Sequence, residues 1–396
     1  MEAPPAHSLP KTMRPVLILT AGYGEGHNAA ARGLKEGFDL LGESRAEVLD
    51  LFAPAFGRFY QRSRADYLTV VNNRPWLWAS VYSALDRFPF TNRLLSLLWP
   101  LKRELVKALK EYRPQAVVSV YPVYGHLLAA AGREAGHSGF ESLVLITDSI
   151  TVNSVWYKCD ADTFLLPNED TAAVMRNASV QQDKLFVSGF PVSTKYSAQG
   201  EARPDPGGEV LPRVLYMVNG QPGRVVPLVE SLLRKGGIEL TVTAGKDEAL
   251  KSALENLALR MQKPLNVLGW VSNMPHLLRR NHLLIGKAGG AAVQEALAAK
   301  TPMLITQILP GQEEGNARLV LQNGCGAHAP TNEAILQSVE QLFAKSAHAW
   351  HQMHRHTCAL SRPDAALTTA RWITQRIRNE GTPRNSRFGL RAPKKQ

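Results

Sequence analysis

The sequence is poor in cysteine and has no long apolar run. Only Cys159, Cys325 and Cys358 occur in 396 residues, and none forms a CxxC pair or a Cys/His zinc-binding spacing. A disulfide framework is therefore not indicated, and we expect a reducing, cytoplasmic compartment. No apolar run approaches the roughly 20 residues that span a bilayer, and residues 1–14 lack the apolar core of a signal peptide. Any contact with a membrane is expected to be peripheral.

Acidic residues are scarce relative to basic ones. The chain has 46 lysines and arginines against 34 aspartates and glutamates, which gives a net charge of +12. An acidic partner is expected, and nucleic acid, an anionic membrane surface and a phosphorylated substrate all fit this charge. The hydrophobic content of 44% is ordinary for a folded protein. Because 396 residues exceed what one hydrophobic core usually supports, we expect two domains.

Two common nucleotide-binding motifs are missing. No GxxxxGK[ST] sequence is present, so a P-loop ATPase is not indicated. The loop Gly22-Tyr23-Gly24-Glu25-Gly26-His27 has a histidine where the dinucleotide fingerprint GxGxxG requires its last glycine. A dinucleotide-binding domain that uses Asp50 to hold a ribose is therefore the weaker alternative for this loop.

Strand and helix patterns alternate along the chain. Apolar runs at 16–20, 48–50, 116–120, 143–147 and 164–166 predict buried strands, and a second series follows at 214–218, 240–242, 267–268, 283–285 and 303–307. This alternation predicts an α/β fold with two Rossmann-like domains, each a parallel sheet with helices on both faces. The expected segments are a disordered leader (1–14), an N-terminal domain (15–195), a linker (196–212), a C-terminal domain (213–361), a C-terminal helix (362–380) and a basic disordered tail (381–396).

The loop after the first strand carries a histidine at the start of a helix. Ligands of open α/β sheets bind beyond the carboxyl ends of the strands, so His27 should face the cleft between the domains. Its imidazole could take a proton from a hydroxyl group, because an unperturbed pKa of about 6.5 lies close to the working pH. A surface histidine without a function is the alternative.

The segment 283–326 predicts two strand-to-helix units with polar loops. Gly289 and Gly290 lie at a helix start, where unpaired backbone N–H groups and the helix dipole can bind a phosphate. The second loop adds Gln312, Glu313 and Asn316, which supply the donors and acceptors that sugar hydroxyls need. The pair of loops therefore indicates a nucleotide-sugar site.

Several motifs resemble one known family. GKAGG at 286–290, EAL at 295–297, PGQEEGN at 310–316 and NGCG at 323–326, with LTAGYGEGHNAAARGL at 19–34, resemble glycosyltransferase family 28. Within it, the resemblance is to the diacylglycerol glycosyltransferases, which include monogalactosyldiacylglycerol synthases and processive diacylglycerol glucosyltransferases. It implies a GT-B fold, with an acceptor and membrane-binding N-terminal domain and a UDP-sugar-binding C-terminal domain facing across a cleft.

The resemblance also implies roles for individual residues. His27 is the expected base, Gly289, Gly290 and Ala291 hold the diphosphate, Glu295 holds the ribose, and Gln312, Glu313 and Asn316 line the sugar pocket. Further donor-binding candidates are Gly22, Gly24, Gly26, Asn219, Gly223, Gly269, Trp270, Val271 and Lys287, although Trp270 is equally suited to a core.

The block Thr147-Asp148, Asn153 and Trp156 resembles a Thr-Asp…His…Trp block of the family, with Asn153 in place of the histidine. Asp148 is expected either to assist His27 as a second catalytic residue or only to cap its loop. Asp160-Ala161-Asp162 forms a DxD sequence, but it lies outside the donor segment, so we expect no metal and no other cofactor.

Residues 56–113 hold 11 of the 29 aromatic residues and 11 basic residues against 4 acidic ones. Aromatic rings suit the lipid headgroup boundary and guanidinium groups suit lipid phosphate, but the same residue types also suit RNA binding. The family resemblance implies an acceptor-side membrane region here, which favours a membrane surface. Core packing explains part of the aromatic content. The expected membrane and acceptor residues are Arg74, Trp76, Trp78, Arg87, Phe88 and Trp99.

These features together predict an inverting glycosyltransferase that moves a hexose from a UDP-sugar to diacylglycerol or a glycolipid. The expected partners are the UDP-sugar, the lipid acceptor and an anionic membrane, with no nucleic acid, and the expected location is the inner face of the plasma membrane. The alternatives are an N-acetylglucosaminyltransferase acting on another lipid-linked acceptor, a non-hydrolysing UDP-N-acetylhexosamine 2-epimerase, and a UDP-sugar-binding protein without turnover.

Overall fold

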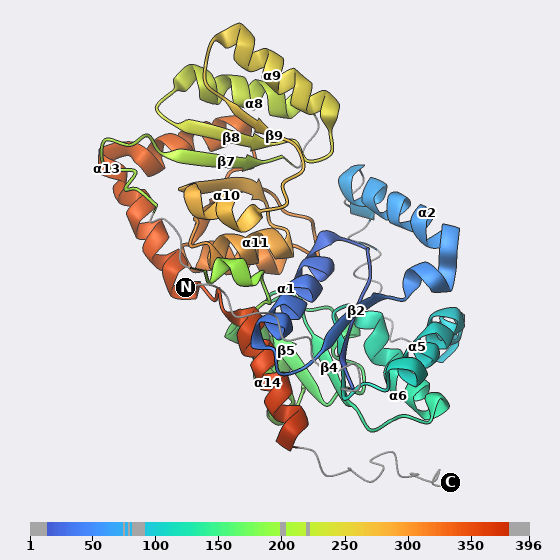
Figure 1. The fold of residues 1–396 in the computed structure, drawn as a ribbon. Helices are drawn as coiled ribbons and strands as arrows, with labels where there is room; N and C mark the ends of the chain where they lie inside the picture. The colour runs from blue at the N-terminus through green and yellow to red at the C-terminus, as the bar shows by residue number, and fades with distance from the viewer. Residues whose placement is uncertain are drawn as a thin grey trace.

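Two parallel six-stranded sheets form the framework of the protein (Figure 1). The computed structural model describes residues 14–73, 76–77, 80, 92–198, 203–218 and 222–379. The predictions for the leader, for the basic tail and for Arg74, Trp78, Arg87, Phe88 and Asn219 lie outside these residues. The predicted α/β fold with two Rossmann-like domains is confirmed.

The first sheet has the strand order β2-β1-β3-β4-β5-β6, and all neighbouring strands run parallel. The strands are β1 (Val16–Thr20), β2 (Ala46–Asp50), β3 (Ala116–Ser119), β4 (Glu141–Leu145), β5 (Thr163–Leu166) and β6 (Leu185–Val187). The chain reverses direction across the sheet between β1 and β3, so the loop after β1 opens at a topological switch point.

Helices cover both faces of this sheet, because alternate side chains of β1 point in opposite directions. Val16 and Ile18 pack with α1 (Glu25–Leu41), whereas Leu17 and Leu19 pack with α5 (Trp99–Tyr112) and α6 (Pro122–Ala135). The described residues of this half also form α2 (Phe52–Asn73), which kinks at Gly57, α4 (Asn92–Leu97) and α7 (Glu169–Asn177).

The second sheet has the strand order β12-β11-β10-β7-β8-β9, which is the order of a dinucleotide-binding Rossmann fold. Its strands are β7 (Arg213–Met217), β8 (Glu239–Thr243), β9 (Asn266–Leu268), β10 (Leu283–Lys287), β11 (Met303–Gln307) and β12 (Gly326–His328). The switch point lies between β7 and β10, so the glycine turn after β10 opens there.

The helices of the second half alternate with these strands. They are α8 (Pro222–Lys235), α9 (Glu248–Met261), α10 (Met274–Arg280), α11 (Gly290–Ala298), α12 (Glu314–Gln322) and α13 (Asn332–Leu360), which is interrupted at 344–347. The last helix, α14 (Ala365–Asn379), crosses back to the N-terminal half. It lies along α1 so closely that a Cβ atom at Gly37 would be 2.4 Å from the carbonyl oxygen of Ala366.

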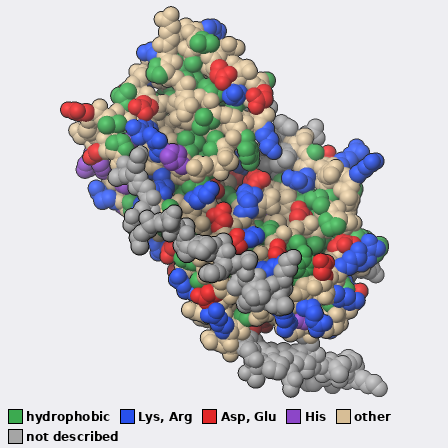
Figure 2. All heavy atoms as spheres, viewed as in Figure 1, with side chains coloured by type: hydrophobic (Ala, Val, Ile, Leu, Met, Phe, Trp, Pro, Cys, Tyr) green, Lys and Arg blue, Asp and Glu red, His purple; other side chains and the backbone are tan. Residues whose placement is uncertain are grey.

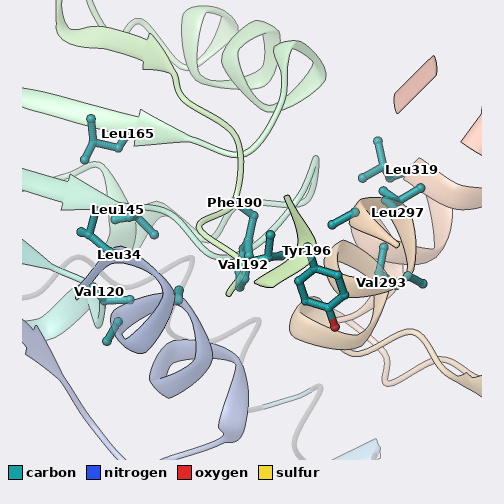
Figure 3. Packing of buried hydrophobic residues seen from close by; sticks show 14 of the residues in the cluster. Leu34, Val120, Leu145, Leu165, Phe190, Val192, Tyr196, Val293, Leu297 and Leu319 are labelled. Atoms are coloured by element: carbon teal, nitrogen blue, oxygen red, sulfur yellow. The ribbon is translucent and has the colours of Figure 1, made fainter. Parts of the chain in front are cut away.

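One hydrophobic core continues from the first domain into the second (Figure 3). Leu34 and Val120 belong to the first domain, Val293 and Leu297 belong to α11, and Tyr196 lies in the same cluster. The two sheets are therefore held in a fixed relation by apolar contacts behind the cleft. Within the described ranges, no helix is long and apolar enough to cross a membrane.

Candidate active site

A cavity of about 790 Å³ lies between the two domains, beyond the carboxyl ends of both sheets. The loops that follow β1, β4, β9, β10 and β11 supply its walls. Most of the predicted site residues line it, namely Gly24, Gly26, His27, Asp148, Gly269, Trp270, Val271, Lys287, Gly289, Gly290, Ala291, Glu295, Gln312, Glu313 and Asn316.

His27 lies in the first turn of α1 and is held by contacts on its ring. Its Nδ1 is 3.1 Å from the hydroxyl oxygen of Thr147, and the ring packs edge-on against Tyr121. Burial lowers the pKa of His27 to about 4, and a hydrogen bond to the backbone of Val120 opposes this shift only in part. The imidazole is therefore neutral at pH 7, which is the form that can accept a proton.

Asp148 also faces the cavity, but its hydrogen bond goes to a different residue. The indole Nε1–H of Trp156 donates to Asp148 Oδ2 over 2.8 Å, and burial raises the pKa of Asp148 to about 6. The Thr147 hydroxyl lies within hydrogen-bonding distance of the His27 ring, whereas Asp148 accepts its hydrogen bond from Trp156. Asn153 caps the short helical turn Ser154–Trp156 by accepting from Val155 N–H, and so helps to fix Trp156 beside Asp148.

The glycine turn after β10 meets the N-terminal domain at close range. Gly289 is the N-cap of α11, and a Cβ atom at Gly290 would lie 3.3 Å from the carbonyl oxygen of Thr147. Glycine leaves the backbone open to the cavity here, at the positive end of the α11 dipole. An anion such as a diphosphate fits this position.

The loop after β11 carries a fixed ion pair. Lys287 Nζ lies 3.0 Å from Glu313 Oε1, and the backbone N–H of Leu309 donates to Glu313 Oε2. Asn316 is buried, donates to the carbonyl oxygen of Ala288 and accepts from Ser149 N–H, so it joins the two domains.

Two further predicted residues face the donor side of the cavity. Burial raises the pKa of Glu295 to about 7, the nearby Arg32 opposes that shift, and Glu25 adds to it. Trp270 is 62% exposed at the cavity wall, with Lys246 Nζ 5.0 Å from the centre of its ring. Trp270 is therefore not a core residue, and its exposed indole can stack on a planar ring.

Gly22 and Gly223 do not line the cavity, although the sequence placed them with the donor-binding residues. The N–H of Gly22 is turned to the hydroxyl of Tyr60 and to the carboxylate of Asp50, which also accepts from Tyr60 over 2.6 Å. Asp50 thus anchors the glycine loop, and it does not line the cavity. Gly223 lies exposed in the first turn of α8.

Some residues of the cavity were not among the predicted site residues. Tyr67 on α2, Arg32 and Glu36 on α1, and Lys195 line it as well. Arg32 and Glu36 follow Glu25 by seven and eleven residues, so all three lie on one face of α1, and this spacing could have indicated them. Nothing in the local sequence of Tyr67 indicates the cleft.

The DxD sequence lies away from the cavity. Asp162 Oδ2 accepts a hydrogen bond from the backbone of Ser142, and neither Asp160 nor Asp162 lines the cleft. In the part of the chain that the structure describes, no group of three or more His, Cys, Asp or Glu side chains could hold a metal ion.

Exposed apolar side chains gather on the N-terminal domain. Trp76 is 67% exposed and Trp99 is 59% exposed, and Phe59 and Leu97 are also exposed. Arg103 lies over the Trp99 ring at 5.4 Å. Figure 2 shows that basic side chains on the visible face are spread over both domains.

Two Rossmann-like domains with a cavity between the carboxyl ends of their sheets form the GT-B architecture. A family model for monogalactosyldiacylglycerol (MGDG) synthase matches residues 27–192, and the model for the glycosyltransferase family 28 C-terminal domain matches residues 223–367. The chain belongs to glycosyltransferase family 28.

Curated relatives match over most of the chain. A probable monogalactosyldiacylglycerol synthase, chloroplastic, from Glycine max is 26% identical over 92% of this chain and 71% of its own length. The processive diacylglycerol beta-glucosyltransferase of Bacillus subtilis (strain 168) is 24% identical over 84% of this chain and 88% of its own length.

Solved structures match in fold. Acinetobacter baumannii MurG has a TM-score of 0.57 and 15% identity, and covers 91% of this chain and 99% of its own. An S. aureus MnaA–UDP structure has a TM-score of 0.60 and 10% identity, and covers 93% of this chain and 98% of its own.

Proposed function

We propose that the protein transfers a hexose from a UDP-sugar to the hydroxyl group of diacylglycerol or a glycolipid, with inversion at the anomeric carbon. The observation that carries the proposal is the pairing of His27 from one domain with the Gly289–Gly290 turn from the other on the walls of one cavity. A base and an anion site are the two groups that a single displacement needs.

The reaction follows from this arrangement. The neutral imidazole of His27 takes the proton of the acceptor hydroxyl as its oxygen bonds to the anomeric carbon. The bond from that carbon to the diphosphate oxygen breaks, and UDP leaves with the electron pair. The backbone N–H groups at the start of α11 and the ammonium of Lys287 stabilise the charge that develops on the diphosphate.

The remaining cavity residues hold the donor. Glu295 binds the ribose hydroxyls, Trp270 stacks on the uracil, and Gln312, Glu313 and Asn316 face the hexose. We propose that the N-terminal domain binds an anionic membrane, at the cytoplasmic face of the plasma membrane, and the exposure of Trp76 and Trp99 supports this proposal.

The test is a transfer assay with defined components. The protein is incubated with UDP-glucose, UDP-galactose or UDP-N-acetylglucosamine and with anionic vesicles that contain diacylglycerol. We expect a glycosyl-diacylglycerol with a β-glycosidic linkage when the donor is an α-linked UDP-hexose, as read from the NMR signal of the anomeric proton. An α-linked product would overturn the inverting displacement. Conversion of UDP-N-acetylglucosamine without any lipid product would indicate an epimerase instead.

A further inference from the structure

An acidic side chain lies at the glycine turn that is proposed to bind the diphosphate. Glu313 is buried, and its Oε1 lies 3.6 Å from the position that a Cβ atom on Gly289 would take. The same position lies 3.4 Å from Cε of Lys287, whose Nζ is 3.0 Å from Glu313 Oε1. Both members of this ion pair therefore border the space in which an anion at the turn would sit.

The two members of the pair differ in how they are held. The side chain of Glu313 is 7% exposed, and its Oε2 accepts a hydrogen bond from the backbone N–H of Leu309 over 3.0 Å. A buried carboxylate needs a partner for its charge, and Lys287 provides it. The side chain of Lys287 is 42% exposed and lines the cavity. Since an ammonium has three N–H groups, Lys287 can contact a phosphate group while it stays paired with Glu313.

The charge of Glu313 opposes anion binding at this turn. Lys287 attracts a phosphate group and Glu313 repels it, and repulsion between like charges a few ångströms apart is appreciable even at a protein surface. The pair as a whole is nearly neutral, so it gives little reward for additional charge on a ligand. UDP carries about one negative charge more than a UDP-hexose at pH 7, because its terminal phosphate group has a second ionisation with a pKa of about 6. The pair therefore distinguishes the two ligands by charge.

We propose that Glu313 is the counter-ion of Lys287 and sets the preference of the site for UDP-hexose over the product UDP. Its charge opposes the additional charge of UDP, whereas a hexose hydroxyl can donate to the lone pairs that remain on its carboxylate. The inference rests on the proposed function, because it takes the Gly289–Gly290 turn as the diphosphate site. Its consequence is that the loop after β11 keeps the binding of UDP weak and so favours release of the product.

The experiment measures the binding of UDP, UDP-glucose and UDP-galactose by calorimetry and needs no transfer. Glu313→Gln removes the charge and keeps an oxygen for the N–H of Leu309. We expect UDP to bind this variant about tenfold more tightly than the wild type, because one repulsive charge is gone. The ratio of the dissociation constant for the better-binding UDP-hexose to that for UDP should rise at least about threefold. Damage to the fold would weaken both ligands, so it cannot produce tighter binding of UDP.

Glu314→Gln is the matched control, because it removes the same charge from the next side chain, which is exposed and does not line the cavity. It should bind both kinds of ligand like the wild type. The gain in Glu313→Gln should shrink when the salt concentration is raised from about 0.05 M to about 0.5 M, since screening weakens the repulsion that was removed.

The outcomes separate this inference from the proposed function. Unchanged or weaker binding of UDP to Glu313→Gln, an unchanged ratio, or an equal gain in Glu314→Gln would each overturn the inference. Transfer to lipid by the wild type would in that case leave the proposed function standing. Binding that changes as expected in a protein that transfers nothing to lipid would overturn the proposed function and leave the inference standing.

Discussion

At the scale of single residues, the site depends on how His27 is held. Thr147 provides the hydroxyl that lies 3.1 Å from Nδ1, and burial keeps the ring neutral. A base needs both a free proton-accepting form and a fixed orientation. Thr147 therefore contributes orientation, while burial sets the protonation state.

Replacing Thr147 by Val tests whether the Thr147 hydroxyl orients the His27 ring. Valine keeps the shape and removes the hydroxyl, so we expect kcat to fall about two- to tenfold, as for the loss of one hydrogen bond, with little change in the KM for the donor. Steady-state kinetics of Thr147→Val and Thr147→Ser give the comparison. Serine retains the hydroxyl and should restore most of the rate, and a serine variant as slow as the valine variant would contradict the assignment.

A second buried histidine makes stability depend on pH. His282 Nδ1 accepts from Arg213 N–H, and its Nε2 donates to the carbonyl oxygen of Pro204. A proton added at Nδ1 would point at the Arg213 N–H group and break that hydrogen bond. Burial lowers the pKa of His282 to about 4, below its ordinary value of 6.5. Its stabilising effect is complete above about pH 6.5 and is lost as the pH falls towards 4, because only the unfolded chain gains a proton in that range.

The variant His282→Asn cannot gain this proton and keeps an acceptor at the position of Nδ1. We expect the melting temperature of the wild type to exceed that of the variant at pH 8, and the difference to narrow as the pH falls from 6.5 to 4. Differential scanning fluorimetry across this range measures it. A difference that is constant with pH would show that His282 does not titrate as described.

Sequence reasoning at this scale succeeded where a motif was local. His27, Gly289 and Gly290 could be located because a strand, a turn and a helix start adjoin in the sequence. The sequence did not show what Asn153 does in place of the family's histidine. Its side chain caps the turn that holds Trp156, and this role depends on a loop conformation that composition does not specify.

At the scale of elements, the two domains approach each other closely at the start of α12. Gly315 N–H donates to the Thr151 hydroxyl, and a Cβ atom at Gly315 would lie 1.7 Å from the carbonyl oxygen of Ser149. Only glycine fits between these two backbones. The loop of the sugar pocket is thereby fixed against the loop that follows β4.

We expect Gly315→Ala to push these segments apart. Overpacking of this kind costs roughly 1–3 kcal/mol in the free energy of unfolding, and the same movement should raise the KM for the donor. Chemical denaturation and kinetics measure the two effects. Gly139→Ala is the matched control, because a Cβ atom there meets nothing within 4 Å. Equal behaviour of the two variants would contradict the close contact.

The sequence analysis missed two short edge strands. β1 is an unbroken buried run, whereas β6 and β12 are three residues long and lie at sheet edges, where burial is incomplete. The equally short edge strand β9 was predicted from its apolar pair at 267–268. A short, partly exposed strand leaves little apolar pattern. The predicted C-terminal helix is present as α14, but its docking on α1 rests on contacts between distant segments.

At the scale of the whole molecule, the cleft could be predicted in outline. Both switch points open towards it, and the βα alternation predicted the two parallel sheets, although not their strand orders. The contacts that close it, such as Tyr67 with Gln312, join residues that no local pattern relates. The sequence therefore indicated which loops form the site, and tertiary packing determined which side chains meet there.

The exposed aromatic residues predict how the molecule meets a membrane. Removing the Trp99 ring with Trp99→Ser should weaken sedimentation with anionic phospholipid vesicles about fivefold, because buried apolar area drives interfacial binding. Raising the salt concentration should weaken the binding further, because screening reduces the attraction of basic residues to lipid.

Leu259→Ser is the control for this prediction, since Leu259 is 75% exposed on α9 of the other domain. It should sediment like the wild type. Equal loss in the two variants, or none in Trp99→Ser, would place the membrane contact elsewhere.

The central claim is that His27 activates a lipid hydroxyl across the cavity from a bound UDP-sugar. The most direct measurement is the rate of hexose transfer from UDP-hexose to diacylglycerol by the wild type and by His27→Ala, together with the affinity of each for UDP. We expect His27→Ala to transfer hexose at least about 100-fold more slowly than the wild type, with an unchanged affinity for UDP. A His27→Ala variant that transfers the sugar at the wild-type rate would contradict it.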